Sequence, residues 1–133
     1  MTKSIAIQRL RDVALRVNNL QPMKRFYKEV LGFKVVGEFP NAALLESAEG
    51  YGEHPQVVSM FKRSVPASPK PGSVDHIILK LSHDHYEFRT RWLKHRGFRM
   101  EQKEHHRICL QDPEGNRIEL VCAPRGLEKQ DCQ

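Results

Sequence analysis

A pattern of strand, helix and Gly-Phe pair occurs twice in this chain, and this internal repeat constrains the fold more than any other feature. The second copy begins at His76 and reaches Gly97, while the first begins at Asp12 and reaches Gly32; a phenylalanine follows each glycine. The spacing between the copies changes by only one residue along their length, as a single loop insertion would produce. Such a repeat predicts one supersecondary unit that is built twice.

Local patterning in the first copy predicts a strand, a helix and three further strands. Residues Asp12–Val17 alternate apolar and polar side chains with the period of two that is typical of a half-buried strand. Apolar residues at helical spacing then predict a helix that begins after Asn19 and ends at Gly32, and Tyr27 is interpreted as a core residue on its apolar face. The remaining predicted strands are 33–39, 42–46 and 56–61.

The second copy predicts the same order of elements. The strand at His76 is followed by a predicted helix with Ser82 or Asp84 as its N-cap, and Trp92 is interpreted as core. The apolar residues of this helix are Tyr86, Phe88, Trp92 and Leu93, and the strands predicted after it are 98–103, 106–111 and 117–122. Between the last two strands, Asp112–Asn116 has the composition of a hairpin turn.

These elements predict an α+β fold of two tandem βαβββ modules within a single domain that covers residues 1–133. The predicted parts are module one at about 10–62, a Pro-rich linker at about 63–73, module two at about 74–123 and a polar tail at 124–133.

Charge, apolar content and cysteines indicate which partners and which cellular location to expect. The net charge is +6, but the basic residues are scattered along the chain, which makes a nucleic-acid partner unlikely and favours anionic small ligands. No apolar run approaches the roughly 20 residues that cross a bilayer, and residues 1–6 lack a signal-peptide core, so we expect no membrane association and a cytoplasmic location. Cys109 and Cys122, two of three cysteines, lie in apolar strands and are predicted to be reduced core residues.

The repeat also indicates where chemistry could occur. If the modules pack about a pseudo-two-fold axis, their first strands bring Asp12 and His76 into a shared concavity, and the last strands bring Glu119 opposite about Ser59. An aspartate, a histidine and a glutamate together make a divalent-metal site with positions open to substrate. Two alternatives stay open: His76 and Glu119 hydrogen-bond each other in a binding cup, or Asp12 pairs with a nearby cation.

Four segments of the chain resemble the vicinal oxygen chelate superfamily, which includes glyoxalase I, extradiol dioxygenases, fosfomycin-resistance thiol transferases and bleomycin-resistance proteins. The segments are 12–17, 26–33, 74–77 and 112–120, with Phe-Tyr…Leu-Gly-Phe and Asp-Pro-x-Gly-Asn…Glu-Leu as the most specific motifs. The resemblance implies a cupped, barrel-like mixed sheet with helices outside, and a homodimer.

The resemblance further implies metal ligands on the first and last strands. His76 and Glu119 match those positions, whereas Asp12 replaces the usual histidine and Ser59 lies where glyoxalase I has a carboxylate. The implied function is a metal-dependent enzyme that uses Fe, Mn, Zn or Ni as a Lewis acid on a small, anionic, vicinal-oxygen substrate. Dioxygenase, lyase and thiol-transferase chemistry all stay open.

Other polar residues are either further candidates for the site or ordinary surface side chains. His106 and Arg107 are candidate catalytic or substrate-contacting residues, and Arg16 is a further candidate for holding an anion. His83 and His85 open a helix and are interpreted as surface side chains. The alternative function is a metal-free binding protein of the bleomycin-resistance type, with no metal cofactor; a regulatory or nucleic-acid-associated domain is a third, weaker reading.

Overall fold

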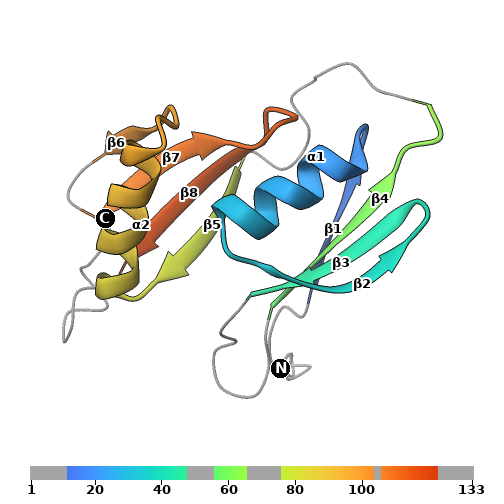
Figure 1. Ribbon diagram of the computed structural model, residues 1–133, viewed down its shortest axis with the longest axis horizontal. Helices are drawn as coiled ribbons and strands as arrows, with labels where there is room; N and C mark the ends of the chain where they lie inside the picture. Colours follow the sequence, from blue (N-terminus) through green and yellow to red (C-terminus); the bar gives the residue numbers. More distant parts are fainter. Residues whose placement is uncertain (1–11, 48–55, 66–75, 104–105, 123–133) are drawn as a thin grey trace, which may run out of the picture. The chain divides into compact units, whose positions relative to one another are not determined.

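The computed structural model describes residues 12–47, 56–65, 76–103 and 106–122 (Figure 1). The chain divides into two compact units, Met1–Ala67 and Ser68–Gln133, which are described separately. His54, His105, Cys132 and the predicted tail fall outside the described residues.

The first unit is a four-stranded sheet with a helical segment. Its elements are β1 (Asp12–Val17), α1 (Leu20–Arg25), the π-helical segment η1 (Phe26–Val30), β2 (Lys34–Phe39), β3 (Ala42–Glu46) and β4 (Val57–Lys62). The strand order is β1-β4-β3-β2, with β1 parallel to β4 and the other pairs antiparallel. The parallel pair is joined by the long connection that such pairs require.

The second unit repeats this topology. Its elements are β5 (His76–Leu81), α2 (His83–His95), β6 (Glu101–Lys103), β7 (Arg107–Gln111) and β8 (Arg117–Cys122). The order is β5-β8-β7-β6, with β5 parallel to β8. The predicted α+β class with two βαβββ modules is therefore confirmed, and the cup between the two sheets stays a prediction.

The helical segment of the first unit differs from the single α-helix predicted. Its second half is π-helical, and the Leu31 N–H donates to the Phe26 carbonyl at 3.3 Å. Beyond it, Gly32 adopts a φ of +81°, a conformation that glycine accepts without steric cost and that ends the helix. The predicted apolar face is correct, because Met23, Phe26, Tyr27 and Val30 are all buried.

Helix α2 begins as predicted, with the Ser82 hydroxyl accepting from the His85 N–H at 3.3 Å. Its buried face consists of Tyr86, Thr90 and Leu93. The prediction that Trp92 is a core residue is wrong: it is only half-buried, and Phe88 is 56% exposed. At 3.6 residues per turn these two side chains point away from the line through Tyr86 and Leu93.

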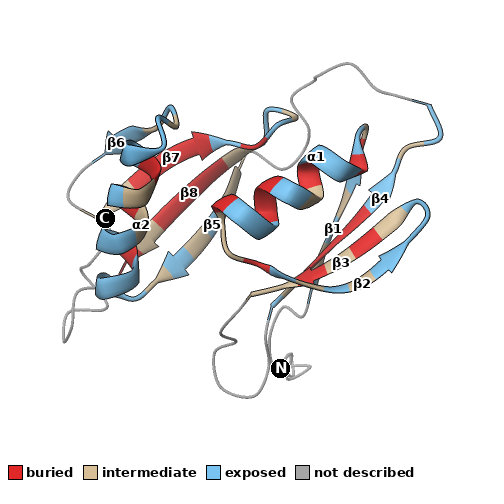
Figure 2. Cartoon of the chain, in the orientation of Figure 1, coloured by how far each residue is buried: buried red, intermediate tan, exposed pale blue. Residues whose placement is uncertain are grey.

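The second sheet has buried residues along β7 and β8 (Figure 2), and its two faces carry different kinds of side chains. Paired residues share a face, so the strand register places Ile108, Ile118 and Leu120 on the buried face, which packs against α2. The opposite face carries mainly charged and polar side chains, together with Ile78 and Val121. This division leaves one face of the sheet available for a polar site.

The predicted hairpin turn is confirmed between β7 and β8. Asp112 is buried, and its carboxylate accepts from the N–H groups of Glu114 and Asn116, each at 2.9 Å. The Asn116 side chain adds a 2.8 Å hydrogen bond to the same carboxylate. Gly115 has a φ of +85°, which completes the turn.

Other features of the fold either agree with the predictions from the sequence or differ from them by a few residues. Cys109 and Cys122 are buried and not in a disulfide, as predicted. Strand β6 begins at Glu101 rather than at residue 98, and β2, β4 and β7 begin one residue later than predicted.

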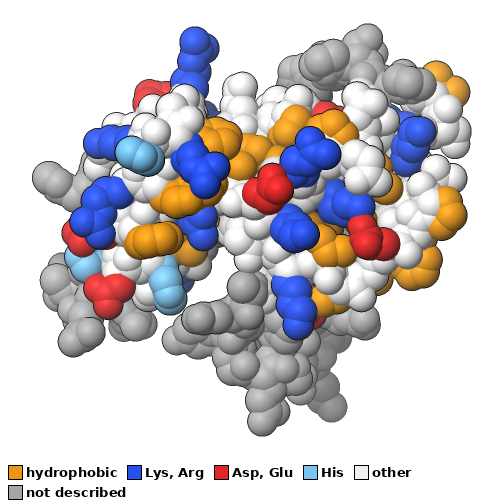
Figure 3. Space-filling model, viewed as in Figure 1, with side chains coloured by type: hydrophobic (Ala, Val, Ile, Leu, Met, Phe, Trp, Pro, Cys, Tyr) orange, Lys and Arg blue, Asp and Glu red, His pale blue; other side chains and the backbone are white. Residues whose placement is uncertain are grey.

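Among the described residues, neither helix combines the length and apolar character that crossing a lipid bilayer requires. Lysine and arginine side chains are dispersed over the face seen in Figure 3.

Candidate functional site

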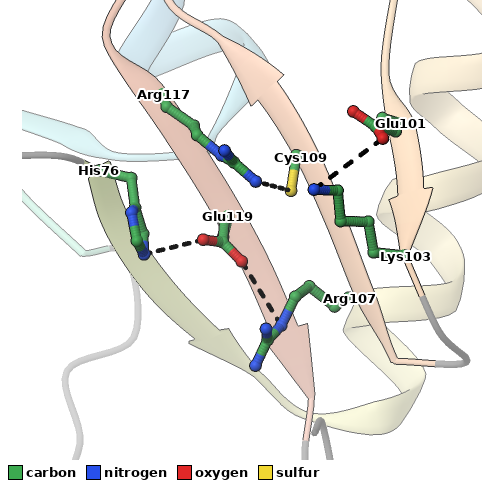
Figure 4. Close-up of polar contacts among 7 residues, drawn as sticks. All are labelled: His76, Glu101, Lys103, Arg107, Cys109, Arg117 and Glu119. Atoms are coloured by element: carbon green, nitrogen blue, oxygen red, sulfur yellow. Dashed lines mark hydrogen bonds and ion pairs between the residues drawn. The ribbon is translucent and has the colours of Figure 1, made fainter.

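The candidate site on the second sheet is built around His76 and Glu119. His76 is the first residue of β5 and Glu119 lies in the middle of β8, and the parallel register pairs Ile78 with Glu119. Both side chains therefore project from the same face, where His76 Nε2 lies 2.8 Å from Glu119 Oε2 (Figure 4). Two residues predicted as metal ligands are thus in direct contact.

Arg107 is the third member of this cluster. Its Nε lies 3.4 Å from Glu119 Oε1, so each carboxylate oxygen faces a different nitrogen group (Figure 4). The Glu119 side chain is only 5% exposed, while His76 and Arg107 are 28% and 31% exposed. A buried carboxylate is costly without partners, and these two groups supply them.

Further polar side chains occupy the same face. Arg117 Nη2 donates to Cys109 Sγ at 3.4 Å, and the register places Lys80 in the same row as Arg107. At the outer strand β6, Lys103 and Glu101 form an exposed ion pair at 3.9 Å. Basic groups thus surround the buried carboxylate of Glu119, an arrangement suited to an anionic ligand.

The first unit presents a matching but altered set. In β1 and β4 the register pairs Asp12 with Val57 and Ala14 with Ser59, as β5 and β8 pair His76 with Arg117 and Ile78 with Glu119. Asp12 therefore occupies the position of His76, and the buried Ser59 that of Glu119. This equivalence was predicted from the repeat. Asp12 belongs to the other unit, so its convergence with His76 and Glu119 stays a prediction.

His106 lies elsewhere, although it precedes Arg107 in the sequence. Its ring meets the ring of His83 edge-on, with 6.2 Å between centroids. Ligand atoms of His83, His106 and Cys122 all lie within 4.8 Å of one another, and among the described residues this group could hold a metal ion. His83 is exposed, as predicted, but the sequence did not predict that these three residues meet.

The sequence signal for this group was that its three residues lie at or next to the ends of predicted strands. Leu81, the last residue of β5, pairs with Cys122, the last residue of β8. His83 follows two residues after β5, and His106 directly precedes β7. The predicted strands placed all three residues near the same end of the sheet, although they did not supply the register.

Comparison with known proteins now establishes the family. Residues 9–120 match the model of the Glyoxalase/Bleomycin resistance protein/Dioxygenase superfamily. The chain belongs to this superfamily, as the resemblance predicted.

Individual relatives agree with this assignment. The chain is 33% identical over 95 residues to the catechol-2,3-dioxygenase of Bacillus subtilis (strain 168). The match covers 69% of this chain but 33% of that protein, so the chain spans about a third of its length.

Solved structures show the same fold. A glyoxalase/dioxygenase from Nostoc punctiforme has a TM-score of 0.73 at 15% identity, covering 94% of this chain and 100% of that one. The fosfomycin resistance protein FosX from Listeria monocytogenes has a TM-score of 0.69 at 14% identity, covering 92% of this chain and 98% of that one.

Proposed function

We propose that this chain is a metal-dependent enzyme of the superfamily, acting on a small anionic substrate with two neighbouring oxygens. The observation that supports this most is the 2.8 Å contact between His76 Nε2 and Glu119 Oε2. Adjacent ligand atoms around an octahedral ion with bonds of about 2.1 Å lie about 3 Å apart. An imidazole and a carboxylate at this distance fit one ion with little rearrangement, and Asp12 is the proposed third ligand.

The donor set suits several metals. One imidazole with two carboxylates is compatible with Fe, Mn, Zn or Ni, with carboxylates favouring the harder ions of this group. When bound, the ion would supply Lewis-acid polarisation of the two substrate oxygens. The protein groups would then orient the substrate around it.

Arg107 has a proposed role in substrate binding. Its guanidinium contacts Glu119 and is 31% exposed, so it can pair with a substrate anion once another cation compensates the carboxylate. Lys80 adds positive charge on the same face. His106 stays a proposed acid/base or substrate-contacting residue, although its ring packs against that of His83.

The Bacillus subtilis relative suggests which reaction to assay first. The name of the Bacillus subtilis protein, catechol-2,3-dioxygenase, makes ring cleavage of a catechol the first reaction to assay. A catechol carries two neighbouring oxygens, which fits the proposed chemistry. Lyase and thiol-transferase reactions are the next to test, and a homodimer and a cytoplasmic location stay predictions from the sequence.

A metal-free binding protein is the second candidate. Both Glu119 oxygens have a nitrogen partner within the second unit, so the buried carboxylate is compensated by protein groups alone. Asp12 and Ser59 occupy positions where the family resemblance implies other metal ligands. These two departures also favour a metal-free binding protein. In this case Arg107 and His76 would bind an anionic ligand directly.

Metal analysis separates the two candidates. Untagged protein purified without chelator is measured by elemental mass spectrometry, beside His76→Ala, Glu119→Gln and Asp12→Ala. The enzyme proposal expects these variants to lose about one equivalent of metal per chain relative to wild type. His95→Ala, which removes an exposed histidine at the end of α2, is the control that keeps it.

Each outcome has a consequence. Equal metal content in wild type, His76→Ala and Glu119→Gln, before and after incubation with Fe²⁺ or Mn²⁺, would contradict the enzyme proposal. Anion binding by calorimetry that is lost in Arg107→Gln would then support the binding protein. With metal bound, catechol cleavage in the presence of Fe²⁺ is followed by absorbance.

A further inference from the structure

We propose that His83, His106 and Cys122 form a second metal site, selective for zinc-like ions, on the opposite face of the sheet from His76 and Glu119. The ligand atoms of the three residues lie within 4.8 Å of one another. Two imidazoles and a thiolate are typical ligands of Zn²⁺. The site shares no ligand with the His76 and Glu119 pair, and this use of His106 is an alternative to the acid/base role proposed above.

The strand register places the two sites on opposite faces. Cys122 has the same parity along β8 as Ile118 and Leu120, which lie on the buried face that packs against α2. Glu119 has the other parity and points with His76 to the polar face (Figure 4). One ion therefore cannot be shared between the two groups of ligands.

The backbone holds two of the three ligands in place. The Cys122 N–H donates to the His106 carbonyl at 3.1 Å, which ties the end of β8 to the start of β7. Cys122 is fully buried, so its position is set by packing. His83 is the first residue of α2, directly after the Ser82 N-cap, and is 45% exposed on its side chain. The third ligand can thus adjust its rotamer on the surface.

The ligand atoms of the three residues must move slightly closer together to bind one zinc ion. Tetrahedral zinc with bonds of about 2.0–2.3 Å holds its ligand atoms about 3.3–3.8 Å apart. The present separations of up to 4.8 Å therefore require the ligand atoms to move closer by about 1 Å. With three protein ligands, the fourth position is open to water or an external ligand.

Glu87 supplies a supporting carboxylate. Its Oε1 lies 3.3 Å from His83 Nε2, one turn along α2. Metal-binding histidines commonly pair their other ring nitrogen with a carboxylate, which fixes the orientation of the ring. Glu87 is therefore assigned as a positioning residue for His83.

Binding changes the protonation of the thiol. The Cys122 S–H bond is replaced by a metal–sulfur bond, and the proton is released to solvent, so binding becomes tighter as pH rises. A bound ion would connect the start of α2 to the ends of two strands. We expect it to stabilise the second unit in proportion to the logarithm of free zinc concentration.

Cobalt substitution tests the site without any activity measurement. Co²⁺ added to the metal-stripped chain of residues 1–133 is expected to give a thiolate-to-cobalt charge-transfer band in the near ultraviolet and tetrahedral bands in the visible. Both signals should vanish in Cys122→Ser and His83→Ala, and Zn²⁺ should displace them. Glu87→Gln should keep the band and weaken binding by about 10–100-fold.

Matched variants give the controls. Cys109→Ser removes the other buried cysteine of this sheet, and His85→Ala removes a histidine of the same helical turn; both should keep the cobalt signal. His76→Ala should also keep it, which separates this site from the proposed enzyme site.

The outcomes distinguish the two proposals. A cobalt signal that His76→Ala removes and His83→Ala retains would overturn the second site, as would the absence of a thiolate band in wild type. If Cys122→Ser does not fold, the exposed His83→Ala variant still decides. Loss of the cobalt signal in His83→Ala, with the signal kept in His76→Ala, would support the second site. The enzyme proposal is tested separately by the metal content of the His76, Glu119 and Asp12 variants.

Discussion

Glu119→Gln tests the cluster on the polar face of the second sheet. Glutamine keeps the size of the side chain but removes its negative charge. The change weakens two contacts at once, the 2.8 Å contact with His76 and the 3.4 Å contact with Arg107. It also leaves the guanidinium of Arg107 beside a neutral, buried group.

The expected loss of stability follows from the burial of the three residues. Removing one partner of a fully buried ion pair costs about 3–5 kcal/mol, whereas exposed pairs contribute about 0.2–1 kcal/mol. Here Glu119 is buried and its partners are about one-third exposed. Because glutamine also retains a hydrogen-bonding oxygen, we expect the free energy of unfolding to fall by about 1–3 kcal/mol.

Urea denaturation near neutral pH, followed by circular dichroism in the absence of added metal, measures this change. The control is Glu101→Gln on the same sheet, an exposed carboxylate that pairs with Lys103 at 3.9 Å and should change stability by less than about 0.5 kcal/mol. A cycle with Arg107→Gln should give a coupling energy of about 0.5–3 kcal/mol. Equal midpoints for wild type and Glu119→Gln, with the control also unchanged, would refute the reasoning.

Four other substitutions provide three tests of the fold. Leu93→Ala removes a fully buried side chain of α2 and should cost about 2–5 kcal/mol in urea unfolding, whereas Phe88→Ala on the exposed side should cost far less; similar losses would contradict the assigned faces. Gly115→Ala should cost about 1–2 kcal/mol, since the φ of +85° is strained for alanine although no atom lies within 4 Å of an added Cβ; an unchanged midpoint would argue against this turn. The hydrogen bond and positive charge of Lys24 lower the pKa of Glu38 below its ordinary value. Their stabilising effect is therefore present at neutral pH and is lost as pH falls through the lowered pKa. The stability difference between wild type and Lys24→Ala should accordingly be greatest near neutral pH, shrink in acid and shrink with salt; a difference that persists in acid would contradict this pairing.

Much of the fold could be predicted because its signals are local. Alternation in Asp12–Val17, the Ser82 cap and the turn around Asp112 each depend on a few neighbouring residues. The repeat added the shared order of elements along the chain and the equivalence of Asp12 with His76, since two copies of one unit adopt one topology. The contact between His76 and Glu119 followed from that order together with the family resemblance.

Other features depended on tertiary structure. The π-helical turn at Phe26–Val30 and the exposure of Phe88 depend on how each helix packs on its sheet, which periodicity alone does not specify. The pairing of Arg107 with Glu119 requires the register of β7 against β8.

The group of His83, His106 and Cys122 shows the difference most clearly. Each residue could be placed on its element from the sequence, and each had an ordinary surface or core interpretation alone. Only the register that aligns the ends of β5, β8 and β7 brings their ligand atoms within 4.8 Å. Sequence determined the elements because these depend on neighbours along the chain; tertiary structure decided the site because its ligands come from separate elements.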